Sequence, residues 1–180
     1  MRTVPAVFDE VRNVVAEPEI RRMFGGVART WKDSGLSKNR VEEIMIYSRN
    51  MGFRRLGLAF CIGLSDQAKV VSDVFEKRDF DVVSVCCMTG GLCSDDIGLS
   101  TEDKMYPDGR QPQCDPVGQA FLMNRCKTDL NVLLGLCVGD DALFIRHSTA
   151  PVTILAVKDR VFNHDPLAAI PQYKESLEQQ

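Results

Sequence analysis

Three predicted strands end at cysteines. Apolar runs lead into Cys61, into the pair Cys86-Cys87 and into Cys137, and a glycine follows each within three residues. An apolar run of this length predicts a buried strand, and the glycine after it predicts a turn. A thiol at the end of a strand can serve as a nucleophile, a redox partner or a metal ligand. We therefore take these cysteines as the first candidates for chemistry.

The elements that must position these cysteines alternate between strands and helices. Strands are predicted at residues 55–60, 81–86, 131–136 and 152–157, and helices at 38–51, 65–77 and 140–147 and from 115 onward. This alternation predicts an α/β fold with a three-layer, doubly wound, mostly parallel four-strand sheet of order 2-1-3-4. Parallel strands share one carboxyl edge, where binding sites form. Cys61, Cys87 and Cys137 are expected to meet at that edge.

Two further cysteines bear on the composition of the site. Cys86 and Cys87 are adjacent, so in an extended strand they point to opposite faces. We favour Cys87, which is nearer the loop, and keep Cys86 as the alternate. Cys114 follows the longest irregular segment, residues 88–114, and stands just ahead of a predicted helix start at Asp115-Pro116. That position could bring Cys114 to the same edge.

Thiolates gathered at one edge repel one another unless a cation is present. A soft metal resolves this repulsion, so Cys61, Cys87, Cys114 and Cys137 predict a site for an iron–sulfur cluster, our first choice, or for tetrahedral Zn²⁺. Three alternatives stay open: a metal-free thiol redox enzyme with a cysteine activated by a helix start, a non-catalytic metal carrier or sensor, and cysteines that serve only as small core residues. Cys93 and Cys126 are assigned no role.

Polar residues near the same edge suggest a binding site for a small anionic or sulfur-containing ligand. Positive charges after the fourth strand could hold an anion, and glycine-rich backbone could donate N–H groups to it. The candidates are Lys158, Asp159, Arg160, Asp140, His164, Gly90 and Gly91. The alternative readings are an ion pair at a solvated strand end, a helix cap at Asp140 and a turn residue at His164. Whether the protein is an enzyme stays open.

Composition excludes several classes of function. The chain has 180 residues and a net charge of −3, with its basic residues scattered, so we expect no nucleic-acid partner. It has no apolar run of the ~20 residues that cross a membrane and no apolar leader at its start, so we expect no membrane association and a cytoplasmic location. The Rossmann and P-loop glycine patterns are missing, which disfavours a nucleotide enzyme.

The first helices are expected to form an extension to the main domain. Val7, Val11 and Val14 share a helical face, and Pro18 starts a second helix. We predict that residues 1–35 form a helical N-terminal extension packed on the core, and that residues 36–180 form an α/β cysteine-rich domain whose first helix is capped by Ser37. The extension could instead serve as a lid or as the contact surface of a homodimer.

Several short motifs resemble those of a known family. They are Gly57-Leu-Ala-Phe-Cys-Ile-Gly-Leu64, Val83-Ser-Val-Cys-Cys87, Cys114-Asp-Pro116, Gly135-Leu-Cys-Val-Gly139, Ala150-Pro-Val-Thr153 and Lys158-Asp-Arg160. Over roughly residues 38–168 the chain resembles a family of uncharacterised, predicted metal-binding proteins, the domain of unknown function eighteen forty-seven. The resemblance implies a metal site drawn from Cys61, Cys86, Cys87, Cys114 and Cys137.

The chain departs from the family pattern in two ways. Where members often have lysine, histidine and asparagine, it has Met88, Asp140 and Asp115. It also has no cysteine before Cys61, whereas members commonly carry a cysteine cluster near the amino end. A second metal site or electron relay is therefore not expected here, which makes a redox role less well supported than a single cluster.

Overall fold

The chain divides into two compact units, Met1–Arg54 and Arg55–Gln180. The computed structural model describes residues 4–107 and 109–178. The first unit holds the helices α1 (Val4–Ala16), α2 (Pro18–Ser34) and α3 (Arg40–Met51). Helix α3 thus groups with the amino-terminal helices, and the separation of residues 1–35 from residues 36–180 stays a prediction.

Helices α2 and α3 contact each other through glycine and arginine. A Cβ on Gly26 would overlap the side chain of Met51, so the absence of a side chain allows the close approach. Arg22 and Arg29 of α2 donate to the carbonyls of Met51 and Asn50, which lie at the end of α3 and lack partners within their own helix.

The start of α3 differs from the prediction. Its cap is Asn39 rather than Ser37: the Asn39 side chain accepts from the Glu42 N–H, and Glu42 accepts from the Asn39 N–H in return, each at 3.1 Å. This reciprocal pair is a capping box, which satisfies two amide donors at once. Ser37 instead donates to the carbonyl of Ser34, in the turn after α2.

The apolar face of α1 is largely exposed. Val7, Val11 and Val14 keep 46%, 47% and 50% of their surface accessible. Trp31 of α2 is also largely exposed, at 62%. Packing of this segment on the α/β domain, and its alternatives as a lid or a dimer surface, therefore stay predictions.

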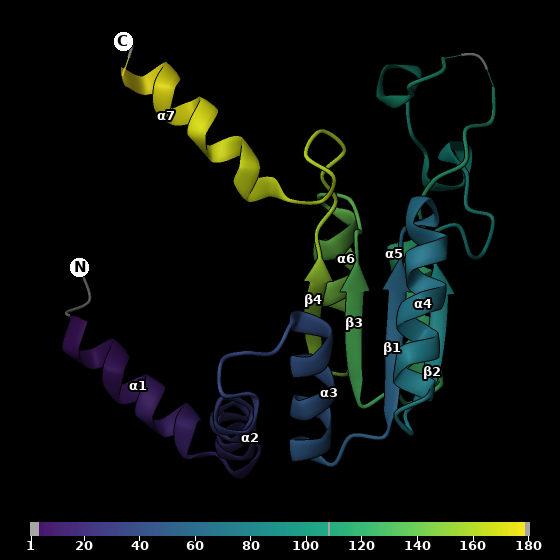
Figure 1. Ribbon diagram of the computed structural model, residues 1–180. Helices are drawn as coiled ribbons and strands as arrows, with labels where there is room; N and C mark the ends of the chain where they lie inside the picture. The colour runs from purple at the N-terminus through teal and green to yellow at the C-terminus, as the bar shows by residue number, and fades with distance from the viewer. Residues whose placement is uncertain (1–3, 108, 179–180) are drawn as a thin grey trace. The chain divides into compact units, whose positions relative to one another are not determined.

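The second unit is built on a four-stranded parallel sheet. Its strands are β1 (Arg55–Phe60), β2 (Asp81–Cys86), β3 (Leu130–Leu134) and β4 (Val152–Ala156). All pairings are parallel and the order is β2-β1-β3-β4, which confirms the predicted α/β fold and strand order. All four carboxyl ends therefore lie on one edge (Figure 1).

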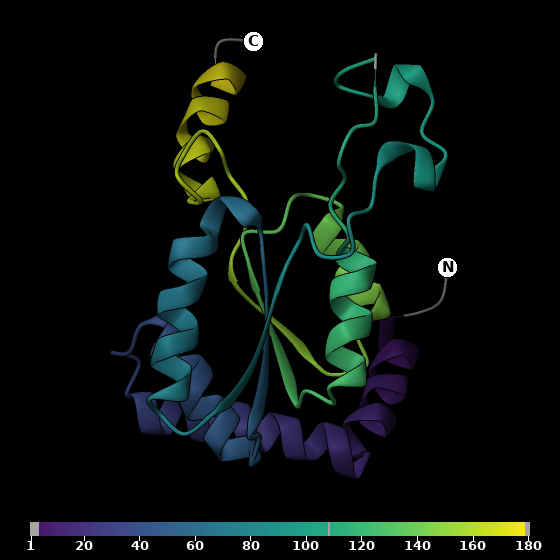
Figure 2. The ribbon, with the colours of Figure 1, turned by 90° about the vertical axis from the view of Figure 1, so that its right-hand side faces the viewer.

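Helices cover both faces of this sheet. Figure 2 shows α4 (Ser65–Glu76) on one face and α5 (Pro116–Arg125) with α6 (Asp140–His147) on the other, so the unit has three layers. The connections carry short 3₁₀ turns, η1 (Ile62–Leu64), η2 (Ser94–Ile97), η3 (Thr101–Asp103) and η4 (Pro166–Ala169), and the described chain ends in α7 (Ile170–Glu178). No helix of the described residues has the length and apolar character that crossing a bilayer requires.

Strands β3 and β4 end earlier than predicted. Gly135 has φ +66°, and its N–H donates to the carbonyl of Ala156 at 2.7 Å, which turns the chain out of the sheet. A Cβ on Gly135 would overlap the side chain of Leu64, so only glycine fits both the conformation and the space. Cys137 consequently lies three residues beyond the last residue of β3.

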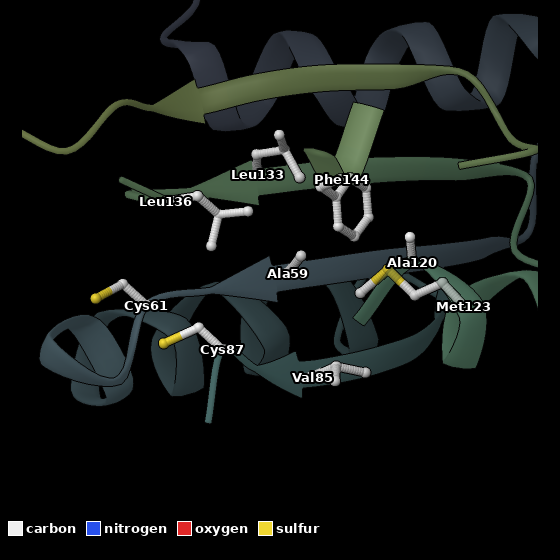
Figure 3. Close-up of a cluster of buried hydrophobic side chains, with 9 residues drawn as sticks. All are labelled: Ala59, Cys61, Val85, Cys87, Ala120, Met123, Leu133, Leu136 and Phe144. Carbon is white, nitrogen blue, oxygen red and sulfur yellow. The ribbon is translucent and has the colours of Figure 1, made fainter. Parts of the chain in front are cut away.

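The core between the sheet and helices α5 and α6 includes two of the candidate cysteines. Figure 3 shows buried side chains of β1, β2 and β3 packed on Ala120, Met123 and Phe144, with Cys61 and Cys87 at the carboxyl end of the cluster. The buried face of α5 includes a polar residue, because Gln119 is fully buried while Phe121 is 58% exposed.

A polar cluster lies inside this unit where β1 meets β3. The fully buried Asn131 accepts from the Thr128 hydroxyl at 2.7 Å and donates to the Ser148 hydroxyl at 2.8 Å. Its side-chain oxygen occupies the space where a Cβ on Gly57 would lie, and the Met123 sulfur is 2.7 Å from the same point. Gly57 therefore makes room for a buried hydrogen-bond network.

Gly57→Ala should lower the free energy of unfolding by roughly 2–4 kcal/mol, because the added methyl group displaces Asn131 or forces β1 from β3. Urea unfolding measures the loss. Gly25→Ala is the matched control: its methyl group meets only the mobile tip of Arg29 within a helix, so stability should stay within about 0.5 kcal/mol or rise. Equal unfolding midpoints for the two variants would contradict the packing argument.

Candidate functional site

Cys61 and Cys87 lie side by side at the carboxyl ends of β1 and β2. The register pairs Phe60 with Cys86, and the Cys87 N–H continues it by donating to the Phe60 carbonyl at 2.9 Å. Cys61 therefore stands opposite Cys87, and the two thiols are within hydrogen-bonding distance. The Ile62 N–H donates to the Cys87 sulfur at 3.3 Å, which holds that sulfur on the Cys61 side.

The long loop returns Cys114 to the same edge. Its two arms pair with each other through Ser94 N–H to Gln111 O at 2.8 Å and Gln113 N–H to Leu92 O at 2.9 Å. At the base, the Asp115 N–H donates to the Cys87 carbonyl at 2.7 Å. This closure brings the Cys114 thiol within hydrogen-bonding distance of Cys87.

Asp140 and Cys137 complete the edge on the other side. The cap of α6 is supplied by Asp141, whose carboxylate accepts from the N–H groups of Gly139 and Ala142 at 3.1 and 2.8 Å. The expectation that Asp140 caps this helix is therefore wrong, and its side chain faces the thiols of Cys114 and Cys137 within hydrogen-bonding distance of both.

Two cations flank these groups. The Lys158 ammonium lies within hydrogen-bonding distance of the Cys61 sulfur, and an Arg160 guanidinium nitrogen lies 3.2 Å from the Cys137 sulfur. Both follow β4, and the Lys158 N–H donates to the carbonyl of Leu136 at 3.3 Å, which anchors this segment to the end of β3.

The contacts form one continuous row of side chains. We call it the thiol row; in order of contact it comprises Lys158, Cys61, Cys87, Cys114, Asp140, Cys137 and Arg160. Each member is close enough to influence the ionisation of the next, although they come from four loops. The site residues remain a prediction, but four of the cysteines named from the sequence do lie together.

The charged neighbours of Cys61 favour its thiolate. Burial raises the pKa of Cys61, but the Gly63 N–H and the Lys158 ammonium outweigh it, so the pKa lies below its ordinary value. The side chain is nevertheless only 8% exposed, so any reagent must approach from the carboxyl edge.

Burial raises the pKa of three other acidic members of the row, Cys87, Cys114 and Asp140. Burial raises the pKa of Cys87, only partly offset by the Ile62 N–H and Cys114. Burial and the nearby Cys87 and Asp140 raise the pKa of Cys114 well above its usual range. Burial also raises the pKa of Asp140. The row thus brings several acidic groups together, and a cation placed among them would favour their ionised forms.

The donors are not arranged around a single point. Within residues 4–107 and 109–178, no three His, Cys, Asp or Glu side chains are placed so that they could hold one metal ion. A row is not the closed shell that tetrahedral zinc requires. The structure thus shows cysteines near one another and no metal site.

The remaining cysteines lie apart from these contacts or at their margin. Cys86 ends β2 half-buried, packed against the core cluster. Cys93 lies in the long loop, where its N–H donates to Asp96. Cys126 is exposed at the end of α5. The roles of all three stay open.

Several predicted anion-binding residues are engaged in local structure. The Asp159 carboxylate accepts from the N–H groups of Val161 and Phe162 at 2.9 and 2.8 Å, which forms a turn. His164 has φ +69°, and its Nδ1 accepts from the Asp159 N–H at 3.3 Å, so the neutral ring carries its proton on Nε2. Their role in binding a ligand stays untested.

Gly90 and Gly91 have a negative neighbour. Both have positive φ, +98° and +67°, as expected of a turn. A Cβ on Gly90 would lie 2.9 Å from a carboxylate oxygen of Asp115, the residue that caps α5 by accepting from the Gly118 N–H. This carboxylate opposes an anion at Gly90, and the prediction for these two glycines also stays untested.

Gln119 supports the site and was missed from the sequence. Its Nε2 donates to the carbonyls of Val85 and Phe60 at 2.7 and 3.3 Å, one residue before Cys86 and Cys61. Its Oε1 accepts no hydrogen bond among the described residues. The sequence carried little signal for this, because a glutamine in a helix is expected to face solvent unless buried partners satisfy its amide.

Gln119→Met should reduce the free energy of unfolding by about 1–3 kcal/mol, because two buried carbonyls at the strand ends lose a donor. Urea unfolding at neutral pH checks this. Gln67→Met, at an exposed position of α4, is the control and should leave the midpoint unchanged. An unchanged urea midpoint for Gln119→Met would show that the two hydrogen bonds from Gln119 contribute nothing to stability.

The fold and this edge define a class: a parallel α/β protein with a thiol-rich carboxyl edge. The chain belongs to DUF1847, a family described as a protein of unknown function, whose pattern matches residues 1–155. This match extends to the first residue, beyond the motifs that suggested residues 38–168. Membership is confirmed, and the description assigns no metal.

One curated protein is similar to this chain over most of its length. The chain is 40% identical over 135 residues to "Uncharacterized protein MJ0455" of Methanocaldococcus jannaschii. The aligned stretch covers 75% of this chain and 68% of that protein. No solved structure matches the chain. Function must therefore be argued from the thiol row itself.

Proposed function

We propose that this protein binds a soft metal centre through Cys61, Cys87, Cys114 and Cys137, with an iron–sulfur cluster as first choice and zinc as second. The observation that carries the proposal is the grouping of four cysteines at one sheet edge, with Lys158 beside Cys61 and Arg160 3.2 Å from the Cys137 sulfur. Thiolates are the preferred ligands of both kinds of centre.

The charges of the four thiolates, Lys158 and Arg160 favour a metal centre with a net charge of +2. Four thiolates carry four negative charges, and a doubly positive centre removes two of them. Lys158 and Arg160, each beside a sulfur of the row, remove the other two. Zn²⁺ and an oxidised cuboidal cluster both meet this requirement for the four thiolates, and an ionised Asp140 would leave one negative charge in the row.

The extended arrangement of the donors favours a cluster over a single ion. One ion needs its ligands gathered around one point, and no three donors among the described residues are so gathered. A cluster of several irons and sulfides is larger, so its cysteine ligands stand farther apart. A site spread over four loops suits that size better.

Asp140 bears on the choice between enzyme and carrier. It lies between Cys114 and Cys137 and offers an oxygen within the row. A centre with one position not held by cysteine could bind a small anionic or sulfur-containing substrate oriented by Lys158 and Arg160. A centre held by four cysteines would instead serve a non-catalytic carrier or sensor.

The test is the metal content of protein prepared without oxygen. We expect iron with acid-labile sulfide at a fixed ratio per chain and thiolate-to-iron absorption in the visible range, or else stoichiometric zinc. Protein lacking iron and zinc after reconstitution with iron and sulfide, and after addition of Zn²⁺, would end the proposal.

A further inference from the structure

The edge also contains a pair of thiols in register. Phe60 and Cys86 are partners in the parallel pairing of β1 and β2, and the Cys87 N–H to Phe60 carbonyl bond extends that pairing by one residue. Neighbouring strands lie about 4.8 Å apart, which falls inside the Cα separation that a disulfide requires. Both sulfurs point past the strand ends in the same direction (Figure 3).

Local contacts hold the two sulfurs together. The Ile62 N–H keeps the Cys87 sulfur on the Cys61 side at 3.3 Å, and the two thiols are within hydrogen-bonding distance. Both cysteines are free in this structure. Cys114 also contacts Cys87 but faces Asp140 as well, so its sulfur has a competing partner.

We propose that Cys61 and Cys87 form a reversible dithiol–disulfide couple, oxidised by a low-molecular-weight disulfide. The sulfur of Cys61 attacks the small disulfide and releases one small thiol, and the sulfur of Cys87 then displaces the second. The protein loses two electrons and two protons, and the small disulfide gains them as two thiols.

The couple needs no metal, so it goes beyond the proposed function and does not depend on it. It does use two of the proposed metal ligands. Oxidation would remove both from coordination, and a bound centre would in turn protect both from oxidation. If both proposals hold, the redox state of Cys61 and Cys87 decides whether the carboxyl edge can bind the metal centre.

The test treats the full-length chain, stripped of metal with a chelator, with oxidised glutathione and then digests it without reduction. Mass spectrometry should find Cys61 joined to Cys87 as the major cross-link, at least about tenfold over any other pair, and dithiothreitol should reverse it. The same treatment in denaturing urea should scatter the pairings. A major Cys87–Cys114 cross-link, or glutathione adducts without a cross-link, would overturn the proposal.

Single-residue variants test separately the attack by Cys61 and the displacement by Cys87. Cys87→Ser should accumulate a stable glutathione adduct on Cys61, whereas Cys61→Ser should form no cross-link at Cys87. Cys126→Ala, which removes an exposed thiol away from the row, should leave the Cys61–Cys87 yield unchanged. Failure of cross-linking in protein that still binds iron or zinc would reject the couple and leave the metal proposal standing.

Discussion

Cys87→Ala should weaken binding of the proposed metal centre at least about a hundredfold. Cys87 lies between Cys61 and Cys114, so its loss divides the row of donors as well as removing one ligand. Changes in supporting residues around a metal already cost about 10–100-fold in affinity, and loss of a direct ligand should cost more. Iron and sulfide retained after reconstitution and gel filtration, and Co²⁺ titration followed by thiolate absorption, measure the effect.

The controls are cysteines from elsewhere in the chain. Cys126→Ala and Cys93→Ala should retain metal at the wild-type ratio, because Cys126 is exposed at the end of α5 and Cys93 lies out in the loop. Cys114→Ala and Cys137→Ala should behave like Cys87→Ala. Full retention of metal by all three of those variants would place any metal elsewhere.

Lys158→Met should slow the alkylation of Cys61 about tenfold at pH 7 in metal-free protein. The Lys158 ammonium, with the Gly63 N–H, outweighs burial and lowers the pKa of Cys61. Removing the ammonium should raise that pKa, and each unit of increase reduces the reactive thiolate about tenfold below the pKa. Iodoacetamide labelling, quantified on the Cys61 peptide by mass spectrometry, gives the rate.

The pH dependence of the Cys61 alkylation rate distinguishes a change in ionisation from a change in access. Wild-type alkylation should reach its plateau at a lower pH than the variant, and the two rates should converge once the pH exceeds both pKa values. Lys69→Met is the matched control, since Lys69 pairs with Asp73 on the exposed side of α4. A rate difference that persists at alkaline pH would show altered access to the thiol rather than altered ionisation.

The sheet could be predicted because its signals are local. Apolar runs marked the strands, and the alternation with helices determined the order β2-β1-β3-β4. The parallel topology then brought Cys61 and Cys87 together without further information. The strand ends were less certain, because the early exit of β3 depends on contacts of Gly135 with Leu64 and Ala156, which are distant in sequence.

Side-chain roles at the edge were harder to predict. Asp140 and Asp141 are equivalent as sequence, and only the backbone geometry at Gly139 decides that Asp141 caps α6 while Asp140 turns to the thiols. Gln119 was missed because a polar residue in a helix is expected on the exposed face, and its partners, the carbonyls of Val85 and Phe60, come from strands distant in sequence. The exposure of Val7 shows the converse limit, since an apolar stripe predicts a face but not its partner.

The paired arms of the long loop have a consequence for engineering this protein. Hydrogen bonds between the arms, and from the Asp115 N–H to the Cys87 carbonyl, hold the base of this loop together. A fluorescent reporter grafted beyond η3 would therefore stand at the far end of two paired arms whose base lies beside Cys87 and Cys114. Such a reporter would be joined to the carboxyl edge without replacing any residue of the thiol row.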